Sequence, residues 1–262
     1  MVMSVVGVLR RVPFTASVVG VMVVVGVVSG ALWDRAADAA WYPQVAFGVP
    51  SLAEGRWWTP VSGSFLAVVP AAYVPMAGTF ALFVGAAEWR WGTRVAAVAT
   101  VAGQVGSVLL SALLLVLLRW TGWDWAERTA GSLDVGFSAG ALWVAALLSA
   151  AIAPPWRLRF RFGLAVYVLV SFAFLGSLAD VEHLVAVVAG LAAGSAPRDR
   201  APRAEVVVAG VAVVAIGVAV AAVLPSHGPL GDTSRTSTAV WAILVVAVAA
   251  PLLVVGARRR TS

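Results

Sequence analysis

A serine and a histidine in this chain are of the types that carry out nucleophilic chemistry. Ser138 lies in the run Gly-Phe-Ser-Ala-Gly of residues 136–140, and His183 is one of two histidines, with His227 the other. A serine hydroxyl attacks a carbonyl readily only when a neighbouring base takes its proton, and a neutral imidazole is the usual base. The two residues therefore indicate a Ser–His dyad, provided that the fold brings them together.

The composition places this chemistry in a membrane. Of the 262 residues, 61% are hydrophobic and 11% are charged, and the mean hydropathy is +0.97. A soluble domain carries about 25% charged residues. Apolar runs of roughly 18 or more residues can cross about 30 Å of hydrocarbon as helices, and helices satisfy their own backbone groups in lipid. We therefore expect an all-α polytopic membrane bundle with no soluble domain.

Eight apolar segments are long enough to be spans. The stretch 162–196 is too long for one span and carries Asp180, Glu182 and His183 in its middle, so we divide it there. The first segment also resembles a signal peptide, but its apolar stretch exceeds a typical signal core of about 7–15 residues. The expected spans are 13–33, 63–87, 95–118, 136–153, 162–178, 179–196, 206–224 and 239–256.

Arginine placement predicts the orientation of these spans. All 18 basic residues are Arg, and 13 of them fall at the N-terminus, in alternate loops and at the C-terminus. Cytoplasmic loops carry the excess positive charge, so both termini are expected in the cytoplasm. The pI near 11.1 then reflects topology, and the lipid bilayer rather than nucleic acid is the expected partner. Because the chain has no Cys, thiolate catalysis is excluded, and we expect no cofactor and no metal.

This topology gives Ser138 and His183 a similar depth. The spans 136–153 and 179–196 both run from outside to inside, so Ser138 lies in the first turn of one and His183 about one turn below the start of the other. Two parallel helices with one return helix between them account for the separation of 45 residues. Backbone N–H groups at a helix start favour a developing oxyanion. The residues expected to form or support the oxyanion site are Gly136, Phe137 and Ala139.

Four motifs in order resemble the rhomboid family of intramembrane serine proteases, over roughly residues 56–194. The run Arg-Trp-Trp-Thr-Pro of residues 56–60 is similar to the Arg-x-x-Thr-Pro start of the family's second helix. The run Glu-Trp-Arg-Trp-Gly of residues 88–92 is similar to the Glu-x-Arg-x-Gly end of that helix. The remaining two motifs belong to the fourth and sixth helices.

Gly136 and Ser138 resemble the Gly-x-Ser of the family's fourth helix. His183 and the small residues 190–194 resemble its sixth helix, although Ala186 stands where the family has a glycine. The resemblance implies a six-helix core in residues 1–200, with Ser138 as nucleophile and His183 as general base. Two added helices would occupy residues 201–262.

The resemblance also implies a membrane-protein substrate that is cleaved near the outer face of the membrane. A chain without Lys and rich in Ala, Val and Arg is typical of a GC-rich bacterial genome. We therefore expect the protein in a bacterial plasma membrane.

Several departures from the family favour a second interpretation. Counting back from Glu88, Ala72 and Met76 occupy the positions of the family's oxyanion-stabilising His and Asn, and neither side chain can donate a hydrogen bond. Loss of one such donor costs about 10²–10³ in turnover. Ala139 replaces the glycine after the nucleophile, and Leu142 replaces the aromatic residue that supports the histidine. The candidate replacement donors are backbone amides, Tyr73, Thr79 and Gln104.

Three functions stay open at this point. The first is an intramembrane serine endopeptidase, and the second is a catalytically inactive rhomboid-like protein that binds or escorts membrane proteins. The third is a small-solute or proton transporter that uses the outer acids Asp134, Asp180 and Glu182. Asp180 and Glu182 are also the candidates for orienting the His183 ring. The Gly-x-Ser-x-Gly pattern also occurs in soluble α/β-hydrolases, but it requires a preceding strand that this sequence lacks.

Overall fold

The computed structural model describes residue 7 and residues 9–194. Within this range the chain is helical and has no named strand, which confirms the expected all-α class. One isolated β-bridge in this range pairs Phe47 with Asp134. The expected spans 206–224 and 239–256, and with them the expected domain 201–262, lie outside the described residues.

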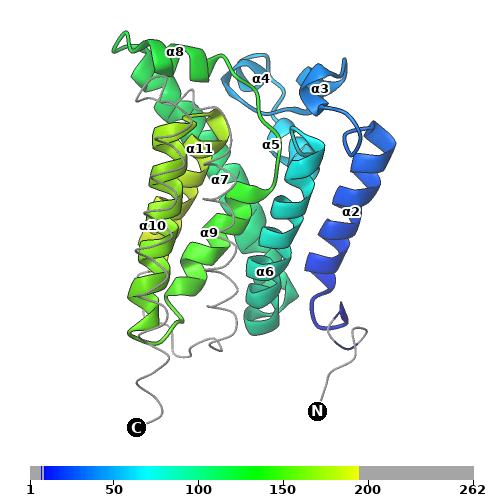
Figure 1. Cartoon of the computed structure of the whole chain (residues 1–262), viewed down its shortest axis with the longest axis vertical. Helices are drawn as coiled ribbons and strands as arrows, with labels where there is room; N and C mark the ends of the chain where they lie inside the picture. Colours follow the sequence, from blue (N-terminus) through cyan, green and yellow to red (C-terminus); the bar gives the residue numbers. More distant parts are fainter. Residues whose placement is uncertain (1–6, 8, 195–262) are drawn as a thin grey trace.

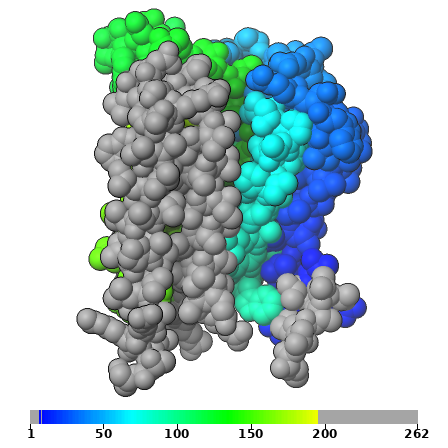
Figure 2. All heavy atoms as spheres, viewed as in Figure 1, coloured from blue at the N-terminus to red at the C-terminus, as the bar shows by residue number. Residues whose placement is uncertain are grey.

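Long helices form a bundle, and short helices gather at one end of it. The long helices in the described part are α2 (Pro13–Ser29), α6 (Tyr73–Trp91), α7 (Thr93–Arg119), α9 (Ser138–Ser149), α10 (Trp156–Phe174) and α11 (Leu178–Ala193). The short ones are η1 (Ala36–Asp38), α3 (Tyr42–Val45), α4 (Val49–Ala53), α5 (Thr59–Ser62), η2 (Gly63–Phe65), η3 (Pro70–Ala72) and α8 (Asp124–Ala130). Figure 1 shows α3, α4 and α8 together at the upper end of the bundle. In the space-filling view of Figure 2, the green α8 and the blue segment that follows α2 also stand at this end.

Two helices of the described part are long and apolar enough to cross a membrane. They are Pro70–Trp91, with 22 residues, and Thr93–Arg119, with 27 residues. Two further apolar helices, α2 and α9, are shorter. In the described range, the expected spans thus correspond to two full-length helices, two shorter apolar helices, and α10 with α11.

The second expected span, 63–87, is helical only in its later part. The chain up to Ala72 instead forms the short turns α5, η2 and η3. Pro70 begins η3 and Pro75 lies in the first turn of α6, where the missing N–H of proline removes no helical hydrogen bond. The two prolines therefore lie at the start of the helix and do not interrupt it.

Glu88, near the end of α6, joins three helices. Its buried carboxylate accepts hydrogen bonds of 2.8 Å from the backbone N–H groups of Phe14 and Thr15 and from the hydroxyls of Thr15 and Thr93. Phe14 and Thr15 lie in the first turn of α2, where N–H groups have no acceptor within the helix. A carboxylate has about four acceptor positions, and these four donors use them. Glu88 therefore holds α2 and α7 against α6.

The central helix of the bundle is α9, which packs against α6, α7, α10 and α11. At two of these helix contacts the backbones lie so close together that only a glycine fits. A Cβ at Gly140 would lie 2.9 Å from the carbonyl oxygen of Thr100 on α7, and a Cβ at Gly190 on α11 would lie 2.8 Å from the Cβ of Ala146. The small residues 190–194 thus include Gly190, where close contact with α9 requires a glycine.

Candidate active site

A sharp turn places Ser138 at the first residue of α9. Figure 1 shows the chain after α8 entering the bundle before α9 begins. Gly136 has a φ of +139°, a conformation that residues with a side chain rarely adopt. The turn ends at Phe137, which is the N-cap of α9. Ser138 is therefore held inside the bundle rather than on an external loop.

Aromatic packing fixes the residue before Ser138. The buried ring of Phe137 lies 5.0 Å from the ring of Phe80 and 5.9 Å from that of Phe65, measured between centroids. Ala139, on the other side of the serine, is also buried. Gly136, Phe137 and Ala139 were expected to form or support the oxyanion site. Phe137 supports it through these ring contacts.

Gln104 of α7 bridges the two sides of Ser138. Its Nε2 donates to the carbonyl of Gly136 at 2.8 Å, and its Oε1 accepts from the N–H of Gly140 at 2.9 Å. The sequence analysis named Gln104 only as a candidate oxyanion donor. Its bridging role carries no sequence signal, because the two partners lie 32 and 36 residues away.

His183 is positioned by the start of α11. Gly176, with a φ of +57°, forms the turn, and Trp125 Nε1 donates to its carbonyl at 2.7 Å. Ser177 is the N-cap and forms a capping box with Asp180, which satisfies two N–H groups at the helix start. The division expected between residues 178 and 179 is one residue late for the start of α11, whereas α10 ends four residues earlier than expected, at Phe174. The Ser-x-x-Asp pattern of residues 177–180 is the signal that locates the start.

The structure brings the two predicted catalytic residues into contact. Ser138 Oγ and His183 Nε2 are 2.7 Å apart, a distance at which the hydroxyl donates to a neutral imidazole. Both side chains are half-buried. A serine whose hydroxyl donates to an imidazole has the geometry needed for activation as a nucleophile.

An aromatic ring packs beside the imidazole, from an unexpected helix. Leu142, in the turn after Ser138, occupies the position where the resemblance implied an aromatic support. Tyr167 of α10 lies against His183 instead, with ring centroids 6.3 Å apart and planes tilted by 30°. The sequence analysis did not identify Tyr167, because α10 gives no local signal that one of its residues faces α11.

Neither nearby acid orients the His183 ring, contrary to the expectation for Asp180 or Glu182. Asp180 is engaged with Ser171, a very short contact, and with the N–H and hydroxyl of Ser177 at 2.9 and 2.5 Å. Within the described residues, His183 Nδ1 and Glu182 Oε1 are buried without hydrogen-bond partners. The hydrogen bonds of Asp180 therefore go to Ser171 and to the helix start rather than to the imidazole.

The backbone N–H groups of Ser138 and Ala139 are free to bind an oxyanion. Ser138 and Ala139 are the first residues of α9, and their N–H groups have no acceptor among the described residues. The first N–H groups of a helix also carry its positive dipole end. An oxyanion that develops beside Ser138 would be stabilised both by these N–H groups and by the dipole.

Ala72, Tyr73 and Met76, from η3 and the start of α6, do not add a donor to this site. Met76 is buried, and its sulfur lies close to Gly136, 3.5 Å from the position of a Cβ there. Ala72, the last residue of η3, has no donor group. Tyr73 packs against Gly26 of α2, with its hydroxyl oxygen 2.9 Å from the position of a Cβ there. The donors replaced by Ala72 and Met76 are thus not restored by Tyr73.

Three acids are buried at the end of the bundle where α9 and α11 begin. Burial raises the pKa of Asp134, in the loop before α9, to about 7, and the negative charge of Asp180 adds to the rise. Burial also raises the pKa of Tyr42, with smaller contributions from Asp134 and Glu182. No group of three or more His, Asp or Glu residues in the described range is placed to hold a metal ion.

No family model, curated protein or solved structure matches this chain. Function is therefore inferred from the site itself. In the described part, that site combines a serine bonded to a histidine, two free N–H groups at a helix start, and an aromatic ring beside the imidazole. These groups are suited to acyl transfer, in which a nucleophile attacks a carbonyl and an oxyanion develops.

Proposed function

We propose that this chain is an intramembrane serine endopeptidase of the rhomboid kind, with Ser138 as the nucleophile and His183 as the general base. The observation that carries the proposal is the 2.7 Å contact between Ser138 Oγ and His183 Nε2. The free N–H groups of Ser138 and Ala139 support it, because they lie where an oxyanion would form.

The proposed reaction hydrolyses a peptide bond in two steps. His183 Nε2 takes the hydroxyl proton as Ser138 Oγ bonds to the carbonyl carbon, and the carbonyl oxygen becomes an oxyanion near the N–H groups of Ser138 and Ala139. The C–N bond then breaks, and the amine leaves with the proton from His183. Water attacks the acyl-serine with His183 again as base, which releases the carboxyl product and restores Ser138.

The proposed setting is a bacterial plasma membrane, with both termini cytoplasmic. Residues 1–200 would form a rhomboid-like core of six spans, and residues 201–262 would add two more. Two helices of spanning length support this setting, as does the gathering of arginines where α6 meets α7 and in the first turns of α10. The proposed substrates are single-span membrane proteins, cleaved near the outer face.

A second candidate is a catalytically inactive rhomboid-like protein that binds or escorts membrane proteins. The buried thioether of Met76 beside Gly136 favours it, because a non-donor side chain there leaves the oxyanion to backbone groups alone. Loss of one oxyanion donor costs about 10²–10³ in turnover. The two candidates share a fold and differ in whether Ser138 reacts.

The test is covalent labelling of the full-length protein in detergent with a fluorophosphonate probe. We expect the label on Ser138, and its loss in Ser138→Ala and in His183→Ala, because the probe needs an activated hydroxyl. Ser111→Ala is the matched control, since Ser111 is a buried serine without a hydrogen-bond partner for its hydroxyl among the described residues. The labelled peptide is identified by mass.

Absence of label on folded protein would reject the peptidase and leave the binding or escort function. Label that persists in His183→Ala would reject the dyad, because the serine would then react without its base. A label that moves to another serine would reject Ser138 as the nucleophile.

A further inference from the structure

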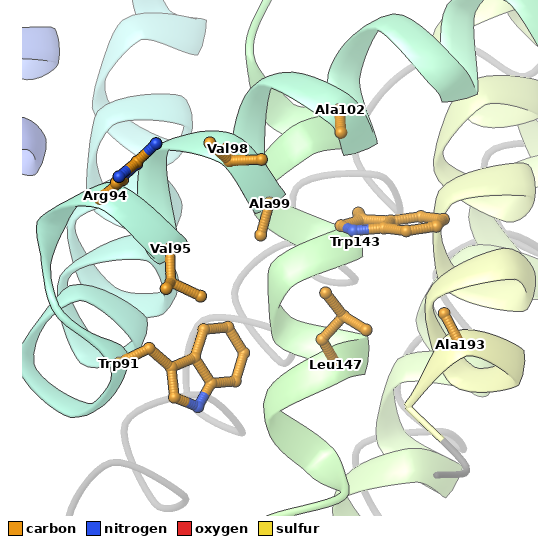
Figure 3. Close-up of a pocket in the computed structure, with 9 residues that line it drawn as sticks. All are labelled: Trp91, Arg94, Val95, Val98, Ala99, Ala102, Trp143, Leu147 and Ala193. Atoms are coloured by element: carbon orange, nitrogen blue, oxygen red, sulfur yellow. The ribbon is translucent and has the colours of Figure 1, made fainter.

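A groove with a volume of about 420 Å³ lies between α7, α9 and α11. It is at the end of the bundle opposite α8, where α7 begins and where α9 and α11 end. Figure 3 shows the side chains of three helices facing one another across it. Among the described lining residues are Val95, Ala99 and Ala102 of α7, Trp143 and Leu147 of α9, and Ala193 of α11.

Trp143 gives the groove a fixed wall. A Cβ at Gly103 of α7 would lie 2.4 Å from the indole of Trp143, so the ring fits against α7 only because residue 103 is glycine. On its other side, a Cβ at Gly190 would lie 2.9 Å from the Trp143 carbonyl oxygen. Because α7 and α11 both pack closely around Trp143, this part of the groove is formed before any ligand binds.

The described lining is apolar along the groove and charged at one margin. Val95 and Val98 are 54% and 63% exposed, which leaves apolar surface open along α7. Arg94 lies at the margin (Figure 3) and is exposed, with no ion-pair partner among the described residues. A ligand that complements such a groove has a hydrocarbon part and an anionic head at one end.

The position of Arg94 favours a lipid as that ligand. Arg94 lies at the end of the bundle that also carries Arg90 and the arginines of 157–161, the end expected to face the cytoplasm. Basic pockets between membrane helices on that side bind anionic lipid headgroups. A volume of about 420 Å³ falls within the usual range of ligand sites, about 300–1,000 Å³.

We infer that this groove binds one anionic phospholipid of the inner leaflet, with an acyl chain along Trp143 and Leu147 and the headgroup phosphate at Arg94. The site is separate from Ser138 and does not depend on catalysis. The guanidinium supplies the charge that distinguishes an anionic from a zwitterionic lipid. The apolar walls hold the chain but do not distinguish headgroups.

Native mass spectrometry of the full-length protein with phosphatidylglycerol or phosphatidylcholine tests this inference. We expect the wild type to retain phosphatidylglycerol preferentially, and Arg94→Gln to bind it about fivefold more weakly. Arg119→Gln is the matched control, because Arg119 is an exposed arginine at the other end of the same helix. Ala102→Phe, which fills the groove, should weaken the binding of both lipids.

A phosphatidylglycerol with a photoreactive group in its acyl chain locates the site independently of headgroup preference. The label is expected on the peptides that contain Ala102, Trp143 and Leu147. Equal phosphatidylglycerol binding by Arg94→Gln and Arg119→Gln would overturn the inference. So would a photolabel on other helices, on the C-terminal region or on none of the chain, since the lipid would then not occupy the groove.

Discussion

At the residue scale, the proposed reactivity of Ser138 depends on how His183, its proposed base, is held. His183 Nε2 contacts the serine, whereas Nδ1 is buried and has no partner in the described part of the chain. In a serine triad a carboxylate bonded to Nδ1 orients the ring and stabilises the imidazolium. We expect the ring contact with Tyr167 to help orient His183, although this contact supplies no negative charge to stabilise an imidazolium.

Replacing Tyr167 should therefore slow the reaction of Ser138. We expect Tyr167→Leu to lower the rate of fluorophosphonate labelling by about three- to tenfold, the range that corresponds to the interaction energy of an aromatic pair. Tyr167→Phe keeps the ring and should label at nearly the wild-type rate. The measurement is the labelling rate against pH, with thermal stability recorded for both variants. Equal rates in the Leu and Phe variants would show that the ring does not position His183.

A second prediction at this scale concerns Asp134 and pH. Its folded pKa of about 7 lies above the ordinary value of 3.8, so the folded state binds the proton more tightly than the unfolded state. The cost of burying this group is absent below about pH 4, grows as pH rises, and reaches at most about 4 kcal/mol above pH 7. Wild-type stability should fall over this window relative to Asp134→Asn.

Thermal unfolding of both proteins between pH 4 and pH 8 measures the difference. Asp134→Asn should be more stable than the wild type at pH 8, and the gap should close towards pH 4. The comparison isolates Asp134, because Tyr42, Asp180 and Glu182 are the same in both proteins. A gap that does not change with pH would mean that Asp134 keeps its ordinary pKa.

At the element scale, the length of α9 decides where the nucleophile lies. This helix has 12 residues, which corresponds to about 18 Å, whereas the hydrocarbon core of a bilayer is about 30 Å thick. If α9 ends near the cytoplasmic face, Ser138 lies well below the outer surface. The expected span of 136–153 would have placed it nearer the surface. Water must then reach the site from the end where α3, α4 and α8 lie.

The junction of α2, α6 and α7 depends on Glu88. Glu88→Gln keeps the shape of the side chain but replaces one acceptor oxygen by an NH₂ group, which faces buried donors. At least one of the four hydrogen bonds is then lost, and a donor is left unpaired. We expect a loss of about 2–5 kcal/mol in the free energy of unfolding. Glu127→Gln, an exposed acid of α8, should change stability little.

Denaturant unfolding of the two variants in the same detergent makes this comparison. If Glu88→Gln and Glu127→Gln unfold alike, Glu88 does not hold the three helices together. A loss of stability together with retained labelling of Ser138 would show that the junction supports the fold without adjusting the site.

At the scale of the whole molecule, the two ends of the bundle carry different chemistry. One end has the short helices, the three buried acids and the starts of α9 and α11, which position Ser138 and His183. The other end has most of the described arginines and the apolar groove beside Arg94. Because the proposed lipid and the proposed nucleophile lie at opposite ends, a variant at one end should leave the readout at the other unchanged.

Much of the helical layout follows from local sequence. A run of apolar residues predicts a helix, because a helix satisfies its own backbone N–H and C=O groups inside a bilayer or a protein core. The helices α7 and α11 lie close to their expected positions. The start of α6 was expected ten residues too early, because hydropathy does not register the short turns that precede Pro70. The capping box of Ser177 and Asp180 is also a local sequence signal, since the two residues are three positions apart.

The sequence by itself determined the all-α class through its composition, and residue type singled out Ser138 and His183 as a candidate pair. The positions of the missing oxyanion donors, Ala72 and Met76, came from the resemblance. Only the tertiary structure decided the rest of the site. Gln104 reaches residues 32 and 36 positions away, and Tyr167 reaches His183 from a neighbouring helix. Such contacts depend on which helix faces meet, and helix rotation is decided by the packing of the whole bundle rather than by any local pattern.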